Sequence, residues 1–344
     1  MEKRFQIQKE VTDIIVENRF IGIIHVSPRV GKTKTVIDAL NTVSRPLEVL
    51  ILAPKIPILG SWEAEMKKWN LRNNINVTLE WSNSIKKNKK FYDLIICDEI
   101  HDYNLSVLSF VKMKQLSGSR ILALTGTLNE TDENRISNIL KLKKLYSYSF
   151  EQAIDDGIIA DYRITCIGID LSEDEQTLYT IWDNRFNRAV EIGNHRGIKG
   201  IISKRADIIY NSVTKLNKTK ELIENIERCL VFTARSTIAD QIGDASFHGK
   251  SNKNTLSLFS NGTLNKLSVI SMISMGTSFY NLKTVVFNQV LNNDSLCIQK
   301  ALRACNAENN RIAQIYMIYL KNTQDENWLN SAIKGFDQNK ITWI

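Results

Sequence analysis

Short apolar runs alternate with amphipathic stretches along most of the chain. In the first half, the runs that predict strands cover residues 21–26, 47–55, 74–81, 92–97 and 120–124. Stretches such as 4–18 and 32–40 place apolar residues three or four positions apart, as amphipathic helices do. Strands predicted in the second half cover residues 229–233, 245–248, 267–273, 284–288 and 312–319. Strands that alternate with helices predict an α/β protein with parallel sheets.

The first strand leads into a turn that can bind the phosphates of a nucleotide. The sequence SPRVGKT follows Val26, and a helix with an apolar face begins at its end. Amide groups at the start of such a helix cradle phosphates, Lys32 adds a positive charge, and the Thr33 hydroxyl can join the ligands of Mg²⁺. Val26 occupies the first glycine position of the full G-x-x-x-x-G-K-[ST] pattern. An ordinary turn that opens a helix is therefore the alternative.

A second signal is the strand that ends in Asp98, Glu99 and, two residues later, His101. Side chains alternate along a strand, so the two carboxylates cannot both do the same task. One can hold Mg²⁺ and the other can orient and deprotonate an attacking water. A helix N-cap is the alternative. Ligands of parallel sheets bind beyond the carboxyl ends of the strands, so we expect this pair to meet the 27–33 turn.

A third strand ends in Thr125, Gly126 and Thr127. Three strands that end at one edge in SPRVGKT, DEIH and TGT, in that order, are far more specific than any one of them. A kinase or GTPase explains neither this order nor a second sheet.

Composition narrows the class of protein. The chain has 344 residues, enough for two domains, and is 43% hydrophobic and 24% charged, as in a globular protein without a membrane span. The beginning of the chain is too polar for a signal peptide. Five scattered cysteines without a C-x-x-C pair favour a reducing compartment over a zinc or disulfide framework. A net charge of +8 fits a polyanionic partner, although a merely basic protein is the alternative.

Three other features are open to two interpretations each. Trp62 and Trp69, seven residues apart, predict a pair that packs in the core. A lysine run and a basic, aromatic segment within 172–226 could lie along nucleic acid or simply face solvent. These residues are Lys86, Lys87, Lys89 and Lys90 in the run, and Trp182, Arg185, Arg188, His195, Arg196, Lys199, Lys204 and Arg205 in the segment.

These motifs together resemble the helicase-type ATPases of superfamily two. Within that superfamily, the chain is most similar to the Swi/Snf-type branch, which translocates on duplex DNA, and to its compact phage-type relatives. The resemblance covers roughly residues 4–330. In the first half it rests on LILAPKIPILGSWEAEMKKW, YDLIICDEIHDYN and ILALTGTLNE, and more weakly in the second on RCLVFTARS, SFHGKS, LSLFSNG, SMGTSFYNL and LCIQKALRAC.

The resemblance implies two tandem RecA-like lobes with ATP in the cleft between them. Lobe 1, the helicase ATP-binding domain, would span residues 1–160, and lobe 2, the helicase C-terminal domain, residues 161–344. The stretch at 162–179 would make the crossing between them.

The resemblance also implies a role for each site residue. Glu99, Lys32 and Arg303 would be catalytic, with Arg303 as an arginine finger. Asp98 and Thr33 would hold Mg²⁺, and His101 with the 125–127 turn would couple nucleotide state to nucleic acid. ATP would contact Gln8 through its adenine, and otherwise Pro28, Arg29, Val30, Gly31, Lys32, Thr33, Lys34, Asp98 and Gln299. Nucleic acid would contact Pro54, Lys55, His248, Gly249, Ser274 and Gly276.

Four positions depart from the family pattern. Arg29, Phe279 and Leu302 stand where glycines are usual, and Asn306 replaces the second of two arginines. Because an arginine finger contributes strongly to phosphoryl transfer, slow or gated hydrolysis is one consequence of the change at Asn306.

The leading hypothesis is an ATP- and Mg²⁺-dependent helicase or translocase, acting on DNA rather than RNA, in replication, recombination or repair. The alternative is a nucleic-acid clamp or scaffold of helicase fold with weak or lost ATPase activity. The resemblance further suggests a monomeric cytoplasmic protein, in the bacterial host if phage-encoded, with specificity supplied by a partner protein.

Overall fold

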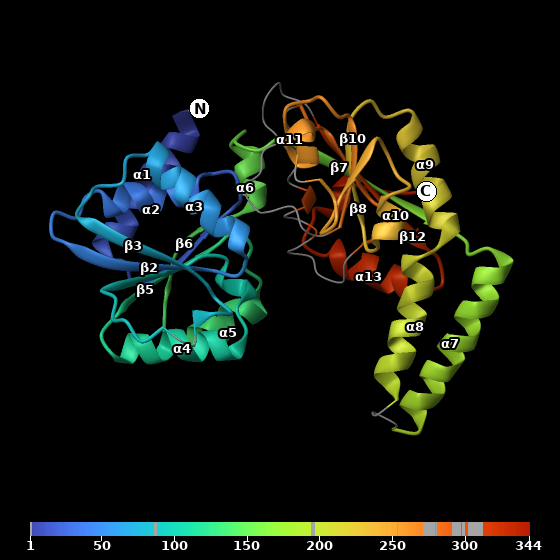
Figure 1. Cartoon of the computed structure of the whole chain (residues 1–344), viewed down its shortest axis with the longest axis horizontal. Helices are drawn as coiled ribbons and strands as arrows, with labels where there is room; N and C mark the ends of the chain where they lie inside the picture. The colour runs from blue at the N-terminus through green and yellow to red at the C-terminus, as the bar shows by residue number, and fades with distance from the viewer. Residues whose placement is uncertain are drawn as a thin grey trace. The chain divides into compact units, whose positions relative to one another are not determined.

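The computed structural model describes residues 2–85, 88–193, 197–252, 254–270, 279, 281–290, 297, 300–301 and 312–344. The chain divides into two compact units, with the change from one to the other between Ile159 and Ala160. Each unit has its own parallel β-sheet with helices packed on it (Figure 1).

The first unit alternates strands and helices from its beginning. Its elements are α1 (Glu2–Glu17), β1 (Gly22–Val26), α2 (Lys32–Leu40), β2 (Leu47–Ala53), α3 (Ile56–Lys68), β3 (Ile75–Trp81), β4 (Leu94–Cys97), the 3-10 helix η2 (Ile100–Asp102), α4 (Leu105–Leu116), β5 (Arg120–Thr125), α5 (Glu130–Leu140), β6 (Lys144–Tyr148) and α6 (Phe150–Asp155).

The strands of the first sheet are all parallel within the described residues, in the order β3-β2-β4-β5-β1-β6. Helices α1, α2 and α3 cover one face and α4 and α5 the other (Figure 1). Because both faces are covered, strand residues such as Ile24, Leu50, Ile95 and Leu122 are fully buried. This burial explains why the strands are continuous apolar runs in the sequence.

The second unit repeats this architecture with an additional helical pair. Its elements are β7 (Tyr162–Ile169), α7 (Glu173–Glu191), α8 (Ile198–Tyr210), α9 (Val213–Glu224), β8 (Cys229–Thr233), α10 (Ser236–Ala239), β9 (Ala245–Phe247), α11 (Asn254–Ser260), β10 (Lys266–Ile270), β11 (Thr284–Phe287), β12 (Ala313–Leu320), α13 (Gln324–Ala332), the 3-10 helix η3 (Gln338–Lys340) and β13 (Ile341–Trp343). Across the described ranges its sheet has the order β13-β7-β12-β11-β8-β10-β9, again with every pairing parallel.

Helices α7 and α8 form an antiparallel hairpin that extends away from the second sheet (Figure 1). Glu175 fixes the base of the hairpin, because its carboxylate accepts hydrogen bonds from the N–H of Val213 and the hydroxyl of Thr214 at the start of α9. Arg205, which belongs to the basic segment in the sequence, is 8% exposed and forms an ion pair with Asp183. Arg205 therefore holds the hairpin together and does not face solvent or a ligand.

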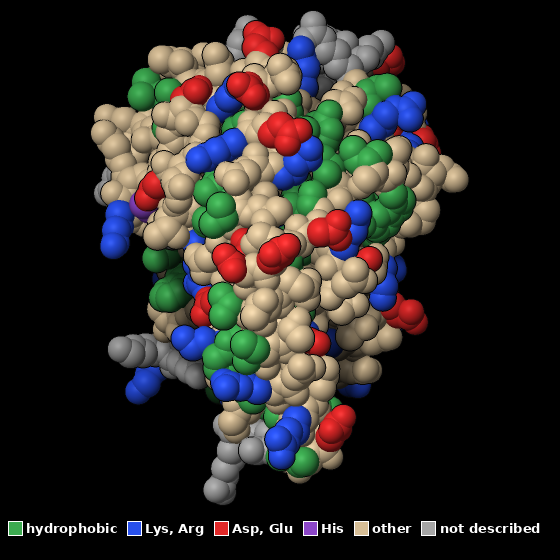
Figure 2. Space-filling view, turned by 90° about the vertical axis from the view of Figure 1, so that its right-hand side faces the viewer, with side chains coloured by type: hydrophobic (Ala, Val, Ile, Leu, Met, Phe, Trp, Pro, Cys, Tyr) green, Lys and Arg blue, Asp and Glu red, His purple; other side chains and the backbone are tan. Residues whose placement is uncertain are grey.

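Acidic and basic side chains are interspersed on the face of the molecule in Figure 2, and hydrophobic side chains form small groups there. The net positive charge is therefore not gathered on this face. Helices in the part of the chain that the structure describes are all too short or too polar to cross a membrane.

The structure confirms the predicted fold class of two α/β units with parallel sheets. Sequence patterns missed β6, β7 and β13. The prediction for the two tryptophans is half wrong: Trp62 is 1% exposed, but Trp69, which follows α3, is only half-buried and donates a hydrogen bond to Glu65 in the last turn of that helix.

Phe279 has a structural role. Its ring is buried and packs edge-on against Phe259, with 5.1 Å between the ring centroids. A core contact therefore accounts for this large side chain at the position where the sequence resemblance implies glycine.

Candidate nucleotide-binding site

Three adjacent strands of the first sheet bring the sequence motifs together. The sheet order places β5 between β4 and β1, all parallel, so their carboxyl ends share one edge. Lys32 begins the helix after β1, Glu99 follows β4, and Gly126 follows β5. Contacts among these residues join the three strand ends, as the sequence predicts.

The turn between β1 and α2 uses left-handed backbone conformations. Gly31, the residue before α2, has φ of 112°, and Arg29 has φ of 70°. The positive φ of Gly31 favours glycine, and a β-carbon there would lie 2.5 Å from the side-chain nitrogen of Gln8 and would displace this side chain. Arg29 adopts a conformation that favours glycine, the residue expected at this position.

Gln8 lies against this turn from α1. Its side-chain amide is buried and donates a hydrogen bond of 2.6 Å to the carbonyl of Val30. One turn later on α1, the Thr12 hydroxyl donates to the carbonyl of Thr35 in α2 at 3.2 Å. Gln8 therefore fixes the shape of the turn from a helix that precedes it in the chain.

Lys32 and Glu99 form an ion pair at the centre of the site. The Nζ of Lys32 lies 2.9 Å from Oε1 of Glu99, and the side chains are 12% and 9% exposed. The backbone N–H of Gly126 donates to Oε2 of the same carboxylate at 3.2 Å. A β-carbon on Gly126 would come within 3.1 Å of the Lys32 Nζ, so the third strand end approaches the pair closely.

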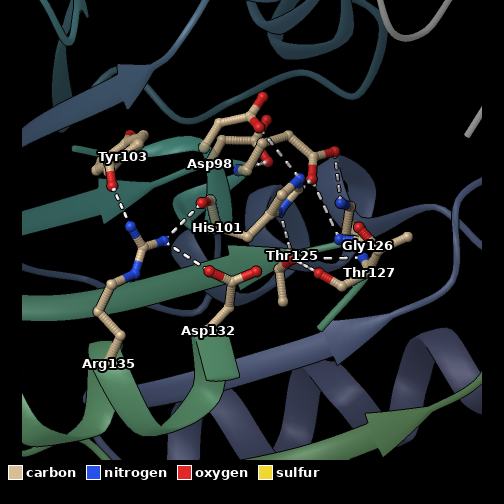
Figure 3. Close-up of polar contacts among 11 residues, drawn as sticks. Asp98, His101, Tyr103, Thr125, Gly126, Thr127, Asp132 and Arg135 are labelled. Carbon is tan, nitrogen blue, oxygen red and sulfur yellow. Dashed lines mark hydrogen bonds and ion pairs between the residues drawn. The ribbon is translucent and has the colours of Figure 1, made fainter. Parts of the chain in front are cut away.

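His101 joins Glu99 to the turn after β5. Its Nδ1 lies 2.8 Å from the Thr125 hydroxyl and 3.6 Å from Oε2 of Glu99. The Thr125 hydroxyl in turn donates to the carbonyl of Thr127, and the labelled residues of this network are drawn in Figure 3. Residues predicted to couple nucleotide state to nucleic acid are thus in direct contact.

Asp98 and Glu99 point to different partners, as expected for neighbours at a strand end. Oδ2 of Asp98 accepts a hydrogen bond of 2.8 Å from the indole Nε1 of Trp62, and Oδ1 accepts one of 2.9 Å from the N–H of Glu99. Glu99 precedes η2 with φ of 45°, and its side chain does not cap that helix. The N-cap interpretation therefore fails for Glu99, which is held instead in a strained backbone conformation.

Arg135 of α5 holds the segment after Glu99 in place. Its guanidinium donates to the carbonyls of His101 at 2.7 Å and Tyr103 at 3.0 Å and also contacts Asp132 at 2.8 Å (Figure 3). The Tyr103 hydroxyl donates to the carbonyl of Leu52, the penultimate residue of β2. These contacts fasten the turn to both a helix and a neighbouring strand.

Burial and charge act differently on the titratable groups of the site. Burial raises the pKa of Asp98 even though the Lys32 ammonium opposes the change. Burial alone would also raise the pKa of Glu99, but Lys32 and His101 lower it below its usual value. The pKa of His25 on β1 falls to about 4, first through burial and then through Lys32. Glu99 is therefore the anionic partner of Lys32 and His25 is uncharged at neutral pH.

The donors present suit an Mg²⁺ ion that arrives with a nucleotide. Among the described residues, no group of three or more His, Cys, Asp or Glu side chains could hold a metal. Mg²⁺ commonly binds through one or two carboxylates while phosphate and water oxygens complete its octahedron. Each oxygen of Asp98 accepts one protein hydrogen bond and keeps a lone pair, and Thr33 is a half-buried hydroxyl at the start of α2.

The other predicted ATP contacts lie around the same turn. Pro28 and Val30 belong to it, and Lys34 lies in the first turn of α2, paired with Asp38. The predicted roles of Gln299 and Arg303, and the departures at Leu302 and Asn306, lie outside the described residues.

The predicted nucleic-acid contacts are placed separately in each unit. Pro54 follows β2 at the same sheet edge as the ion pair, and the exposed Lys55 precedes α3. In the second unit His248 forms a 2.8 Å contact with Asp240, and Gly249 is exposed. Ser274 and Gly276 lie outside the described residues.

The structure describes only some of the basic residues predicted in the lysine run and the helical hairpin. Lys90 is paired with Glu48 at 2.7 Å, and Lys89 is exposed. Lys86, Lys87, His195 and Arg196 lie outside the described residues.

Trp62 and Arg135 were not predicted as site residues. Both act through long-range contacts: Trp62 is 36 residues from Asp98, and Arg135 is 34 residues from His101. A tryptophan on an apolar helix face has the same pattern whether it fills the core or orients a carboxylate, so the sequence held no signal that separated the two.

Comparison with known proteins shows similarity at the level of fold. No protein-family model matches the chain, and the search of curated proteins gives no match. The helicase domain of Hef from Pyrococcus furiosus is similar over 96% of this chain and 97% of that one, with a TM-score of 0.56 and 15% identity.

The ATP-dependent Type ISP restriction-modification enzyme LlaBIII, solved bound to DNA, is similar over 98% of this chain, with a TM-score of 0.68 and 14% identity. This chain spans 31% of that enzyme's chain. At such identities the comparison shows that the paired α/β units are a fold shared with these proteins, and function must be argued from the site.

Proposed function

We propose that this protein is an ATP hydrolase that uses Mg²⁺ and couples hydrolysis to movement along nucleic acid, with DNA as the preferred track. The observation that carries the proposal is the contact of Lys32, Glu99 and Gly126 where three parallel strands end. It supplies a cation for phosphate, a carboxylate for water and a backbone link between two motifs within a few ångströms.

Phosphate would bind at the start of α2. The amide groups of the turn and the positive end of the helix dipole attract phosphate oxygens there. Lys32 would lie against the β and γ phosphates, and Asp98 and Thr33 would hold Mg²⁺, which neutralises phosphate charge during transfer. Gln8, which already fixes the turn, would also contact adenine.

Glu99 would orient the attacking water and accept its proton. Lys32 currently neutralises this carboxylate, and phosphate oxygens would compete for the same ammonium group. A Glu99 carboxylate freed from Lys32 is a stronger base, so phosphate binding itself would prepare the site for hydrolysis.

His101 and the 125–127 turn would report this change to the rest of the protein. Because Glu99 contacts both His101 and Gly126, a change of partner at Glu99 alters both contacts. Pro54 and Lys55, after the next strand along the same edge, are where we expect the nucleic-acid backbone. The DNA bound to LlaBIII supports nucleic acid as the partner. We predict that the protein is monomeric, cytoplasmic and phage-encoded. We also predict that a partner protein supplies its specificity.

Steady-state ATP hydrolysis tests the proposal directly. The purified protein is assayed alone and with duplex DNA, single-stranded DNA and RNA, with Lys32→Ala as the control. We expect strong stimulation by duplex DNA that the Lys32→Ala variant loses. Nucleic-acid binding without hydrolysis would support the alternative of a clamp or scaffold, and hydrolysis that is equal in both proteins would contradict the proposed site.

A further inference from the structure

Trp62 makes a contact that core packing does not require. Its indole N–H, in the middle of α3, donates a 2.8 Å hydrogen bond to Oδ2 of Asp98. The side chains come from different elements and both residues are buried, with 1% of Trp62 and 6% of Asp98 exposed. A hydrogen bond to a carboxylate in such surroundings is stronger than one at the surface.

Asp98 is held by this contact and by one backbone hydrogen bond. The second bond comes from the N–H of Glu99, the next residue, and restrains the carboxylate from the side of the main chain. Within the described residues, Trp62 is the only side chain that donates a hydrogen bond to Asp98. The indole therefore fixes the rotation of the carboxylate together with the backbone N–H of Glu99, and each of the two donors holds one oxygen.

The geometry leaves room for a ligand on the same carboxylate. Each oxygen accepts one hydrogen bond from the protein, so each keeps acceptor capacity for a metal ion or its waters. In proteins, residues that donate a hydrogen bond to a metal-binding side chain orient that side chain and strengthen metal binding.

We propose that Trp62 is a positioning residue that holds the Asp98 carboxylate in the orientation needed to bind Mg²⁺ with a nucleotide. The inference rests on the proposed function, because it takes Asp98 as the Mg²⁺ ligand. It adds a residue from α3 that supplies neither charge nor a ligand and acts only through Asp98.

Trp69, the residue directly after α3, provides a matched control. Its indole N–H also donates to a carboxylate, that of Glu65 one turn earlier in α3. Trp62→Phe and Trp69→Phe therefore remove the same chemical group from two positions seven residues apart. At position 62, the analogue 3-benzothienylalanine keeps the two-ring volume and lacks the N–H, so it separates the hydrogen bond from packing if Trp62→Phe is unstable.

The first measurement is the Mg²⁺ concentration that gives half-maximal ATP hydrolysis. Loss of a hydrogen bond to a charged group should raise this concentration roughly tenfold to a hundredfold for Trp62→Phe and for the analogue. We expect the half-maximal Mg²⁺ concentration of Trp69→Phe to stay within about twofold of that of the unchanged protein, because exposed or local contacts have small effects. Equal Mg²⁺ requirements for the position 62 and position 69 variants would overturn the inference.

The second measurement does not need turnover. The indole ¹H–¹⁵N NMR signals of Trp62 and Trp69 are assigned by their loss in the two Phe variants. Mg²⁺ is then added to the protein with the non-hydrolysable analogue AMP-PNP. We expect the Trp62 signal to shift more than the Trp69 signal.

The two measurements separate this inference from the proposed function. A protein that does not hydrolyse ATP but shows the Trp62 shift would contradict the proposed ATPase and support Trp62 as a positioning residue. Hydrolysis of ATP without a shift of the Trp62 signal would support the proposed ATPase and contradict Trp62 as a positioning residue. A protein with neither would overturn both.

Discussion

A buried lysine–carboxylate pair lies at the carboxyl edge of each sheet, and the two pairs differ in how completely they are enclosed. Lys32 and Glu99 in the first unit are 2.9 Å apart, with side chains 12% and 9% exposed. Lys215 and Asp325 in the second unit are 2.7 Å apart and only 1% and 0% exposed. The same pair of charges thus lies in a partly open site in one unit and in a closed one in the other.

The closed pair is saturated by the protein. Asp325 accepts hydrogen bonds from Lys215, from the N–H of Leu320 and from the Gln289 side chain, and Gln289 also contacts Lys215. Burial lowers the pKa of Lys215, and the charge of Asp325 and its hydrogen bond to the ammonium group oppose that change. Because both side chains are almost completely enclosed and their partners come from the protein, we infer that this pair stabilises the second unit, whereas the open pair can exchange partners.

Lys32→Ala should have the largest effect on activity. The change removes the phosphate-binding cation and leaves Glu99 buried without its ion pair. We expect ATP binding to weaken and turnover to fall by about 10³-fold or more. Hydrolysis assays and equilibrium binding of a fluorescent ATP analogue measure the two effects, and an unchanged rate would remove Lys32 from the site.

Lys215→Met should have the largest effect on stability. It leaves the Asp325 carboxylate buried without a cation, which costs about 3–5 kcal/mol in the free energy of unfolding. Urea unfolding followed by circular dichroism measures this loss. Lys218→Met on the same helix breaks the exposed pair with Glu221 and serves as the control, with an expected cost under about 0.5 kcal/mol. Similar losses in the two variants would show that enclosure is not what distinguishes the pairs.

Arg135→Lys should weaken the first site without touching its charges. A lysine cannot bridge the carbonyls of His101 and Tyr103 as the guanidinium does. We expect a loss of about 1–3 kcal/mol in unfolding free energy and roughly tenfold in turnover, because the turn after Glu99 loses its support. Turnover equal to that of the unchanged protein would show that β4 and η2 position the turn on their own.

Arg29→Gly should have the smallest effect. Glycine adopts the left-handed conformation of this residue without strain, so we expect unfolding free energy to rise by about 1 kcal/mol. Thermal unfolding measures the gain. A loss of stability instead would mean that contacts of the Arg29 side chain outweigh the backbone strain.

The strand ends of the first unit were predictable because their chemistry is local. Lys32, Asp98, Glu99 and Gly126 each follow a continuous apolar run, and a parallel sheet must bring the ends of such runs to one edge. The strand order itself, with β5 between β4 and β1, is consistent with this expectation.

Contacts between distant segments were not predictable. The partners Lys215 and Asp325 are 110 residues apart, and neither has a motif around it. Arg205 has the sequence pattern of a surface cation, yet tertiary packing buries it against Asp183. Strands β6, β7 and β13 were missed because polar residues interrupt them or, for β13, because the strand is only three residues long at the end of the chain.

Glu99→Gln tests most directly the claim that the open pair performs chemistry. The amide keeps the size of the side chain and removes the base. The measurement is ATP hydrolysis per bound nucleotide, with binding followed by a fluorescent ATP analogue. We predict binding close to that of the unchanged protein and turnover lower by about 10²–10⁴-fold. Equal loss of binding and turnover, or turnover that is retained, would contradict the role of Glu99 and with it the account of this site.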